Sequence, residues 1–404
     1  MLTSGPPNAR PPHPPWPPRR RAAVAAAVLA TAGLGYVAVQ PGSDSAPTRD
    51  GPALTVEVRP APYPARTGPP ARPAVFRLTG VPGPGPAGQR LLVGGLDPGV
   101  LDLGAARLTP LPIRMRADEG AELDRGPGGL TTVVLRGSVD QRPRGVALGA
   151  DGRPVPLGPV LDLVPLRDGG VLTEDCAGQA GTGPCTLTGR TATGAPRWSR
   201  SLPRRIDLVR DTPYGLLVRA YQGDQGGVAR LEDARTGGQA RVVGRTYQVL
   251  GADDRHVAFL PPGCAGECGL TLADLDTGET RSLPASPGEP AAVAFSPDGR
   301  RLAVGYAGLL PDNPSSSPQR DGSVVVLDLA GSGRARTVPG LRTGSASTAL
   351  PVWARDGRLL LVVPADGHGT GRVALWTPGA PRLRLLPVAL TGFYGTPGQA
   401  VPLT

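Results

Sequence analysis

The sequence predicts an all-β repeat fold, and three observations lead to that prediction. Short Val- and Leu-rich segments alternate with Gly and Pro, of which the 404 residues contain 59 and 50. The segments 291–295 and 300–306 flank Ser296–Gly299, where Pro presets φ and Gly supplies a left-handed residue, as a tight hairpin requires. A second hairpin follows, from 322–329 to 334–339. Four strands in up-and-down order within one unit are what a blade of a β-propeller needs.

The second hairpin of this unit recurs along the chain, and each recurrence has a Gly-containing turn before a strand rich in Leu, Val or Arg. The turns are marked, 41 to 55 residues apart, by Gly104, Gly152, Gly194, Gly237, Gly278, Gly333 and Gly379. Seven recurrences predict seven four-stranded blades. Six or eight blades remain open, because the first two units lack a clean first hairpin. Ring closure needs a strand from one terminus, either Val75–Leu78 or the tail after Pro387.

Two segments also carry a family resemblance. Phe295–Val304, which reads FSPDGRRLAV, and Pro351–Leu359 resemble the repeat of TolB-type and WD-repeat-like propellers. The resemblance implies a propeller, and it does not identify a ligand or a partner.

The N-terminal part of the chain predicts export and a membrane anchor. Residues 1–21 form a Pro-rich tail that ends in three Arg, and residues 22–40 are apolar and uncharged. Such a segment is at the short end of what spans a bilayer, and the Arg cluster favours a cytoplasmic N-terminus. A cleaved signal peptide is the alternative. A Pro- and Gly-rich linker, 41–73, would lead to the propeller, 74–404.

The net charge of +10 does not predict nucleic-acid binding. Part of the excess lies in the tail, and the remaining basic residues alternate with acidic ones along the chain. Nucleic-acid binding calls for a concentrated basic stripe, with stacking aromatics where the strand is single. We therefore expect no nucleic-acid partner and a monomeric protein.

The four cysteines form two local pairs in loops between second and third strands. An even number in an exported chain predicts disulfides, and we expect Cys176–Cys185 and Cys264–Cys268, although sequence alone leaves three connectivities open. A zinc site is disfavoured because Cys264 and Cys268 lack the Cys-x-x-Cys spacing.

Motifs that carry catalysis are missing from the sequence. It contains no Gly-x-Ser-x-Gly elbow, His-Glu-x-x-His helix or phosphate-binding Gly-rich loop with its Lys. His256 is expected in a strand, and the segment 118–124, with four acidic residues, in a solvated loop before blade 2 rather than in a Ca²⁺ site. We therefore expect no enzyme activity, no cofactor and no metal.

The predicted binding face consists of the loops between second and third strands and the loops between blades, because propellers vary loops on a rigid ring. These loops are Asp175–Pro184, Gln222–Gly226, Pro261–Gly269, Leu309–Asp321 and Pro364–Gly371. Candidate binding residues on this face are Tyr214, Tyr221, Asp366 and His368. Trp353 is expected instead to pack between blades.

These observations predict a non-catalytic binding platform in a bacterial cell envelope, whose partner, an envelope protein or a ligand, the sequence does not identify. The alternative is an enzyme of lyase, hydrolase or dehydrogenase type that acts on a small molecule or glycan at the central channel. It would require polar residues that point inward at the same height on several first strands, and those strands are mainly apolar with occasional Asp. An inert spacer of the cell wall is a third interpretation.

Overall fold

The computed structural model describes residues 77–403 apart from 138–140, 150, 178–182, 223–225, 265–267, 284–287, 309–321, 331–333, 343–347, 365–370 and 391–399. The chain divides into two units, 1–49 and 50–404, and every described residue belongs to the second. The expected tail, membrane segment and linker (1–21, 22–40 and 41–73) lie outside the described residues. Within the described part of the chain, no helix is long and apolar enough to cross a membrane.

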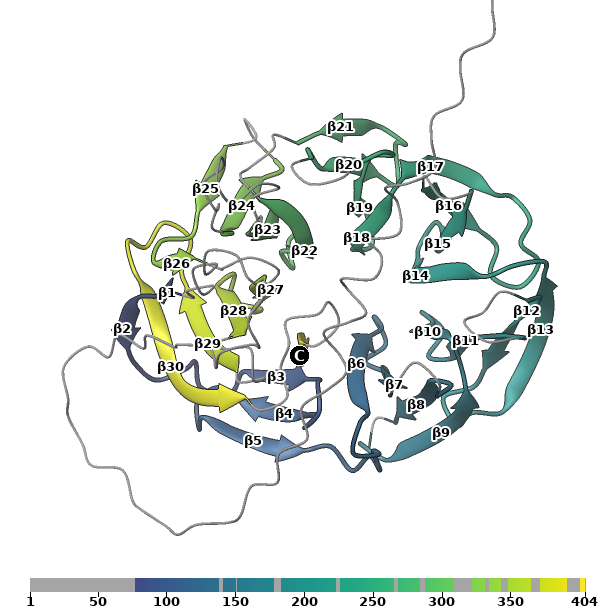
Figure 1. Ribbon diagram of the computed structural model, residues 1–404, viewed down its shortest axis with the longest axis horizontal. Helices are drawn as coiled ribbons and strands as arrows, with labels where there is room; N and C mark the ends of the chain where they lie inside the picture. The colour runs from purple at the N-terminus through teal and green to yellow at the C-terminus, as the bar shows by residue number, and fades with distance from the viewer. Residues whose placement is uncertain are drawn as a thin grey trace, which may run out of the picture. The chain divides into compact units, whose positions relative to one another are not determined.

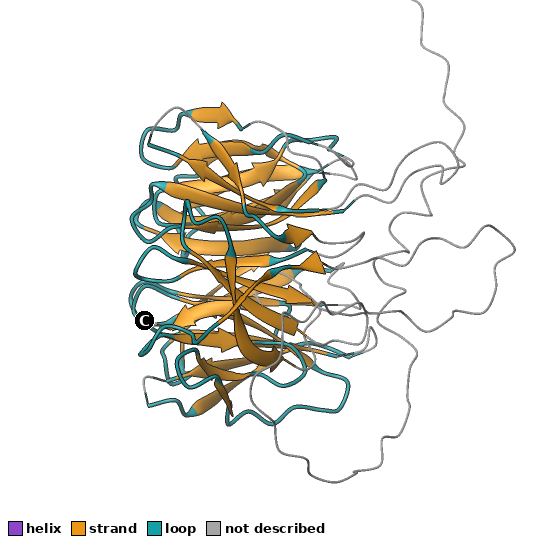
Figure 2. Ribbon diagram, turned by 90° about the vertical axis from the view of Figure 1, so that its left-hand side faces the viewer, coloured by secondary structure: helices purple, strands orange, loops and turns teal. Residues whose placement is uncertain are grey.

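Seven sheets of the second unit surround a common centre, as Figure 1 shows, and Figure 2 shows strands and loops without a helix in its described part. From the inside outwards, blade 1 contains β31 (Ala400–Leu403), β3 (Arg90–Val93), β4 (Gly99–Asp102) and β5 (Arg107–Pro110). Blade 2 contains β6 (Gly120–Arg125), β7 (Thr131–Arg136), β8 (Arg144–Leu148) and β9 (Pro154–Pro159). Blade 3 contains β10 (Asp162–Pro165), β11 (Val171–Cys176), β12 (Cys185–Arg190) and β13 (Pro196–Leu202).

The remaining blades follow the same order. Blade 4 contains β14 (Ile206–Thr212), β15 (Gly215–Tyr221), β16 (Gly227–Glu232) and β17 (Arg241–Thr246). Blade 5 contains β18 (Gln248–Ala252), β19 (His256–Leu260), β20 (Thr271–Asp274) and β21 (Thr280–Ser282), and blade 6 contains β22 (Glu289–Phe295), β23 (Arg301–Ala307), β24 (Val324–Asp328) and β25 (Ala335–Thr337). Blade 7 contains β27 (Leu350–Trp353), β28 (Leu359–Pro364), β29 (Gly371–Trp376), β30 (Leu383–Leu390) and a fifth strand, β2 (Gly80–Pro82). A further pair joins β1 (Arg77–Leu78) to β26 (Leu341–Arg342).

The expected seven-bladed propeller of four-stranded blades is thus confirmed, with one extra strand in blade 7. The marker glycines that the structure describes lie in the turns between third and fourth strands. Gly278, for example, has φ +76° between β20 and β21, and Gly299 has φ +65° in the first hairpin of blade 6. Residues with a Cβ rarely adopt this conformation, and Gly152, Gly194, Gly237 and Gly379 share it with Gly278. In the turn of blade 1, Ala106 rather than Gly104 has a positive φ.

The core consists of apolar clusters between neighbouring blades. One cluster joins Leu187 of blade 3 to Leu216 and Val218 of blade 4, and all three are fully buried. Trp353 of blade 7 is also buried, and its Nε1 donates a hydrogen bond to the carbonyl of Ala294 in blade 6 at 2.9 Å. Each blade therefore covers an apolar face of the next one.

Both ends of the described chain join other blades. The C-terminal strand β31 pairs antiparallel with β3 and completes blade 1, so the tail closes the ring. The other candidate for closure, 75–78, instead contributes β1 to a two-stranded pair with β26, while β2 pairs parallel with β30 at the outer edge of blade 7.

The acidic segment before blade 2 is not the solvated loop expected from the sequence. Residues Gly120–Arg125 form β6, the innermost strand of blade 2. The carboxylate of Glu119 is buried and accepts a hydrogen bond from Arg144 Nε at 2.9 Å. This hydrogen bond holds the pKa of Glu119 below its usual value. The alternation of acidic and small residues that looked like a loop is a strand with ion-paired side chains.

Candidate functional site

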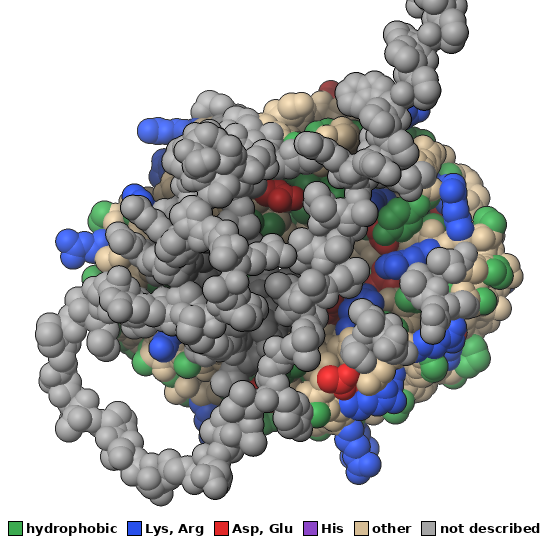
Figure 3. Space-filling view, in the orientation of Figure 1, with side chains coloured by type: hydrophobic (Ala, Val, Ile, Leu, Met, Phe, Trp, Pro, Cys, Tyr) green, Lys and Arg blue, Asp and Glu red, His purple; other side chains and the backbone are tan. Residues whose placement is uncertain are grey.

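A group of charged side chains lies where the first strands of blades 2, 3 and 4 begin. All first strands run in the same direction, so residues near their starts share one face of the ring. Figure 3 shows acidic and basic side chains meeting on this face beside β10 and β14. We call this group the charged cluster, and its members are Glu122, Arg136, Asp162, Glu174, Arg205, Asp207, Arg219 and Tyr221.

Asp162, the first residue of β10, links blade 3 to blade 4. Its Oδ1 accepts a hydrogen bond from the amide of Leu163 at 2.9 Å, and its Oδ2 accepts one from the amide of Leu208 at 3.0 Å. Burial raises the pKa of Asp162 to about 7, against the lowering effect of these amides and of Arg136. The carboxyl group therefore exchanges its proton near neutral pH.

Glu174 on β11 lies directly opposite Asp162 in the strand register and is completely buried. Its Oε1 accepts a hydrogen bond from the amide of Ile206 at 2.9 Å, and its Oε2 has no partner among the described residues. Burial raises the pKa of Glu174 to about 7 as well, and the carboxylates of Asp162 and Asp207 add to the rise.

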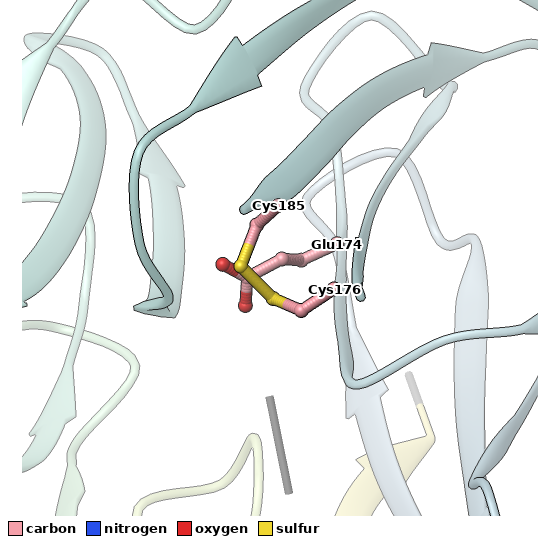
Figure 4. Close-up of side chains that lie close together, drawn as sticks. All are labelled: Glu174, Cys176 and Cys185. Carbon is pink, nitrogen blue, oxygen red and sulfur yellow. A yellow bond between two sulfur atoms is a disulfide. The ribbon is translucent and has the colours of Figure 1, made fainter. Parts of the chain in front are cut away.

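The carboxyl group of Glu174 also lies beside a disulfide, as Figure 4 shows. The carboxylate and the sulfurs of Cys176 and Cys185 lie within 4.8 Å of one another, which resembles a three-ligand metal site. The two sulfurs are bonded to each other, however, and metal ligation by cysteine needs the thiolate. These three residues therefore do not form a metal centre.

Asp207 on β14 contacts two of the arginines of the cluster. Its carboxylate oxygens lie 3.0 Å from Arg219 and 3.5 Å from Arg205, and Tyr221 donates its hydroxyl to Oδ1 at 2.8 Å. The Arg219 guanidinium also lies over the Tyr221 ring, 4.6 Å from its centroid. Burial, with Asp207 as the second cause, raises the pKa of Tyr221 to about 12, so this tyrosine stays protonated and donates.

A separate ion pair at the edge of the cluster comes from blade 2. Arg136 at the end of β7 donates from Nε to the carboxylate of Glu122 on β6 at 2.7 Å. Neither Asp162 nor Glu174 receives a hydrogen bond from a guanidinium among the described residues. The cluster thus contains two carboxyl groups held by backbone amides alone, next to carboxylates that are paired with arginine.

The candidate residues from the sequence do not all meet at this site. Tyr221 belongs to the charged cluster, whereas Tyr214, 41% exposed, lies at the other end of β15, in the turn after β14. A strand crosses the ring from one face to the other, so the two tyrosines lie on opposite faces. Asp366 and His368 lie outside the described residues.

Both expected disulfides are present. Cys176 and Cys185 are opposite residues at the ends of β11 and β12, so their bond joins the two ends of the loop between the second and third strands of blade 3. Cys264 and Cys268 pair in the corresponding region of blade 5. Both bonds therefore fall on the face that carries the charged cluster.

The opposite face has a shallow pocket of about 430 Å³ between the first hairpins of blades 5 and 6, beside blade 4. His256 stacks on Phe295 there with ring centroids 5.8 Å apart, and its Nδ1 lies 3.3 Å from Asp253. Arg210 from β14 reaches Asp254 at 3.3 Å on the same side. The sequence placed His256 in a strand, which is confirmed, but gave no signal for this pocket.

Sequence reasoning missed most of the charged cluster. The Asp residues in the first strands 162–165 and 206–212 were visible, but their shared height around the ring was not. Glu174 had no signal, since it sits inside the otherwise ordinary strand segment 171–176. A search for acidic residues at matching positions in successive blades would have found Asp162 and Asp207.

Comparisons with known proteins show the fold alone. No family model matches the chain, and no curated protein matches it in sequence. A candidate 6-phosphogluconolactonase from Bacteroides fragilis superposes with a TM-score of 0.52 at 12% identity, over 78% of this chain and 96% of that chain. TolB from Acinetobacter baumannii gives a TM-score of 0.44 at 14% identity, over 76% and 78% of the two chains. An oligogalacturonate lyase in complex with manganese gives 0.49 at 14% identity, over 72% and 83%.

Proposed function

We propose that this chain is an extracytoplasmic binding platform of a bacterial envelope. Its partner, a protein or another ligand, binds where the loops between second and third strands meet the loops between blades. The observation that carries the proposal is the bond between Cys176 and Cys185, which fixes the ends of one such loop beside the charged cluster. A loop held in this way loses less conformational entropy when a partner binds.

The cellular setting is part of the same proposal. Two disulfides agree with an oxidising compartment outside the cytoplasm. The apolar segment 22–40 would anchor the chain with its N-terminus in the cytoplasm, or would be removed as a signal peptide. We propose a non-catalytic role, in which the ion-paired arginines of the cluster contribute to recognition.

Site-specific photo-crosslinking tests which face binds. A photoreactive amino acid is placed at Gln222, which is exposed at the loop-face end of β15, or at Tyr214 at the other end of the same strand. After irradiation of cells that produce the full chain, we expect a discrete crosslinked species from position 222 and none from position 214. Equal labelling from both positions, or none from 222, would contradict the proposal.

Catalysis at the charged cluster is the second candidate function. It is favoured by Asp162 and Glu174, whose pKa values of about 7 suit general acid–base chemistry at neutral pH. It is also favoured by Glu122, Asp162 and Asp207, acidic residues on the first strands of three successive blades. The purified chain is incubated with panels of small metabolites and soluble glycans, and Asp162→Asn should lower any turnover by about a hundredfold or more. If no substrate is consumed, this candidate fails.

A further inference from the structure

The buried end of Glu174 is the strongest unexplained feature of the charged cluster. Its Oε2 is one of six buried side-chain polar atoms without a partner among the described residues, and Nε of Arg205 and Nε of Arg219 are two others. Half of these atoms therefore belong to a single cluster. The two arginine atoms are donors, whereas Glu174 Oε2 is an acceptor. Buried polar atoms in native proteins almost always have a partner, so the acceptor Oε2 calls for a hydrogen-bond donor.

We propose that the charged cluster is a subsite for an organic cation, an alkylammonium or guanidinium group, that binds between Asp162 and Glu174. These carboxyl groups receive backbone amides and no guanidinium, as described above, so they keep unshared oxygen lone pairs. A bound cation would donate to those lone pairs and to Glu174 Oε2. This inference rests on the proposed binding function and specifies the chemistry of the ligand.

The spacing of the acidic groups favours an organic cation over a metal ion. The structure groups no three carboxylates of its described residues within 4.8 Å of one another. A Ca²⁺ ion with bonds of about 2.4 Å needs its oxygens within roughly twice that length. Hydrogen bonds from an ammonium group are longer, about 2.8 Å, and a guanidinium group spreads its donors further still.

The cluster is open at its rim and closed at its floor. The side chains of Arg136 and Glu122 are 36% and 39% exposed, and those of Arg205 and Asp207 are 33% and 23% exposed, whereas Glu174 is fully buried. Arg205 is held to Asp207 only at 3.5 Å, so it can move aside when a cation enters. The ligand cation then donates hydrogen bonds to the carboxyl oxygens of Asp162 and Glu174, to which the arginines of the cluster do not donate.

Binding is coupled to proton release. Burial keeps Asp162 and Glu174 partly protonated at neutral pH, and the groups that face them are Arg136, Arg205 and Asp207. When the cation arrives, the O–H bond of one carboxylic acid breaks, its electron pair stays on the carboxylate, and the proton goes to the buffer. Affinity should therefore fall about tenfold per pH unit below pH 7 if one proton is released.

Titration calorimetry of the full chain tests the proposal with defined probes. These are the capped peptides Gly-Lys-Gly and Gly-Arg-Gly, n-butylammonium, and the acetyl-lysine peptide as a neutral comparator. We expect the cationic probes to bind at pH 8 and the neutral peptide not to bind. At pH 6.5, where the carboxyl groups are mostly protonated, binding of the cations should be weaker and its heat should depend on the ionisation enthalpy of the buffer. Peptides that bind better than butylammonium indicate a partner's side chain, and the reverse order indicates a small amine.

Two variants make the test specific. Glu174→Gln should weaken binding at least tenfold and remove most of the proton release. Asp175→Asn removes the same charge one residue away, where the side chain is 48% exposed, and should leave binding unchanged. Absence of cation binding by the wild-type chain at pH 8, or binding at pH 6.5 without proton release, overturns the proposal even if a variant does not fold. If the crosslink from position 222 persists in that case, the cation subsite fails and the binding platform does not.

Discussion

At the scale of single residues, blade 3 contains two carboxyl groups whose hydrogen bonds come from backbone amides. Asp162 and Glu174 hold backbone amides of blade 4, so they join two blades as well as form part of the charged cluster. Sequence gave no hint of this role, because the partners lie 32 and 46 positions away. Trp353 was easier to predict, since large aromatic side chains in a repeat pack between blades, and its interblade hydrogen bond confirms the expectation.

Glu174→Gln should change how stability depends on pH. The folded-state pKa of Glu174 is raised from 4.5 to about 7, so the folded state binds more protons than the unfolded state between these values. Ionisation of Glu174 therefore lowers the free energy of unfolding as pH rises from about 4.5 to 7, and the full decrease is present above pH 7. The amide does not titrate. Urea unfolding measures the free energy of unfolding at pH 5 and at pH 8. The decrease between these two pH values should be smaller in the variant than in the wild-type chain, by on the order of 2 kcal/mol.

The pKa of Asp162 is raised as well, so this carboxyl group adds to the pH dependence of stability in the same direction. Some of the pH dependence should thus remain in Glu174→Gln and decrease further in the double variant with Asp162→Asn. An unaltered pH slope in Glu174→Gln would show that its carboxyl group is ionised in the folded protein at acidic pH.

At the scale of strands, the outermost strands contact the next blade through arginine. Arg200 Nε on β13 donates to the carbonyl of Ala234 at 3.0 Å, and Arg241 on β17 donates to that of Leu275. Arg281 on β21 donates to the carbonyl of Leu329 at 3.0 Å. Each acceptor lies in the turn between the third and fourth strands of the following blade. The arginines that sequence analysis noted in fourth strands thus link neighbouring blades at the outer edge.

Arg281→Ala should lower the free energy of unfolding by about 1 kcal/mol, because it removes a charged hydrogen bond between blades 5 and 6 near the surface. The matched control is Arg107→Ala on β5, which also lies on an outermost strand and has no such bond among the described residues. Guanidinium unfolding of both variants measures the difference. Equal losses would mean that edge-strand arginines act through solubility or strand propensity, not through this contact.

At the scale of the whole ring, glycine spacing predicted the number of blades but not the charged cluster that residues of several blades form. Turn glycines are tied to backbone conformation, which is local and visible in sequence, as at Gly278. The charged cluster combines residues of three blades. The strand β6 looked like a loop because the sequence does not show that Glu122 pairs with Arg136 on the neighbouring strand β7. Closure stayed open in the sequence because both ends contain strand-like segments, and the structure uses both in different ways.

Removal of residues 400–404 should destabilise the ring far more than removal of residues 77–82. The first deletion takes away β31, whose Val401 packs on the cluster around Leu92 and Ala121. The second removes β1 and the outermost strand of a five-stranded blade. We expect thermal unfolding to shift by about 10 °C or more for the C-terminal deletion, and by much less for the N-terminal one. A similar shift in both would mean that β2 closes the ring as much as β31 does.

The position of β31 also sets the order in which the protein can mature. Blade 1 contains the first complete hairpin that the ribosome makes within the ring, yet its innermost strand follows every other strand of the ring in the sequence. Blade 1 is therefore incomplete until the other six blades have been synthesised, and the edge of β3 stays unpaired until β31 has left the ribosome. An unpaired strand edge can pair with the strand of another chain. During synthesis, the chain therefore needs a chaperone most at blade 1, the blade whose hairpin is made first.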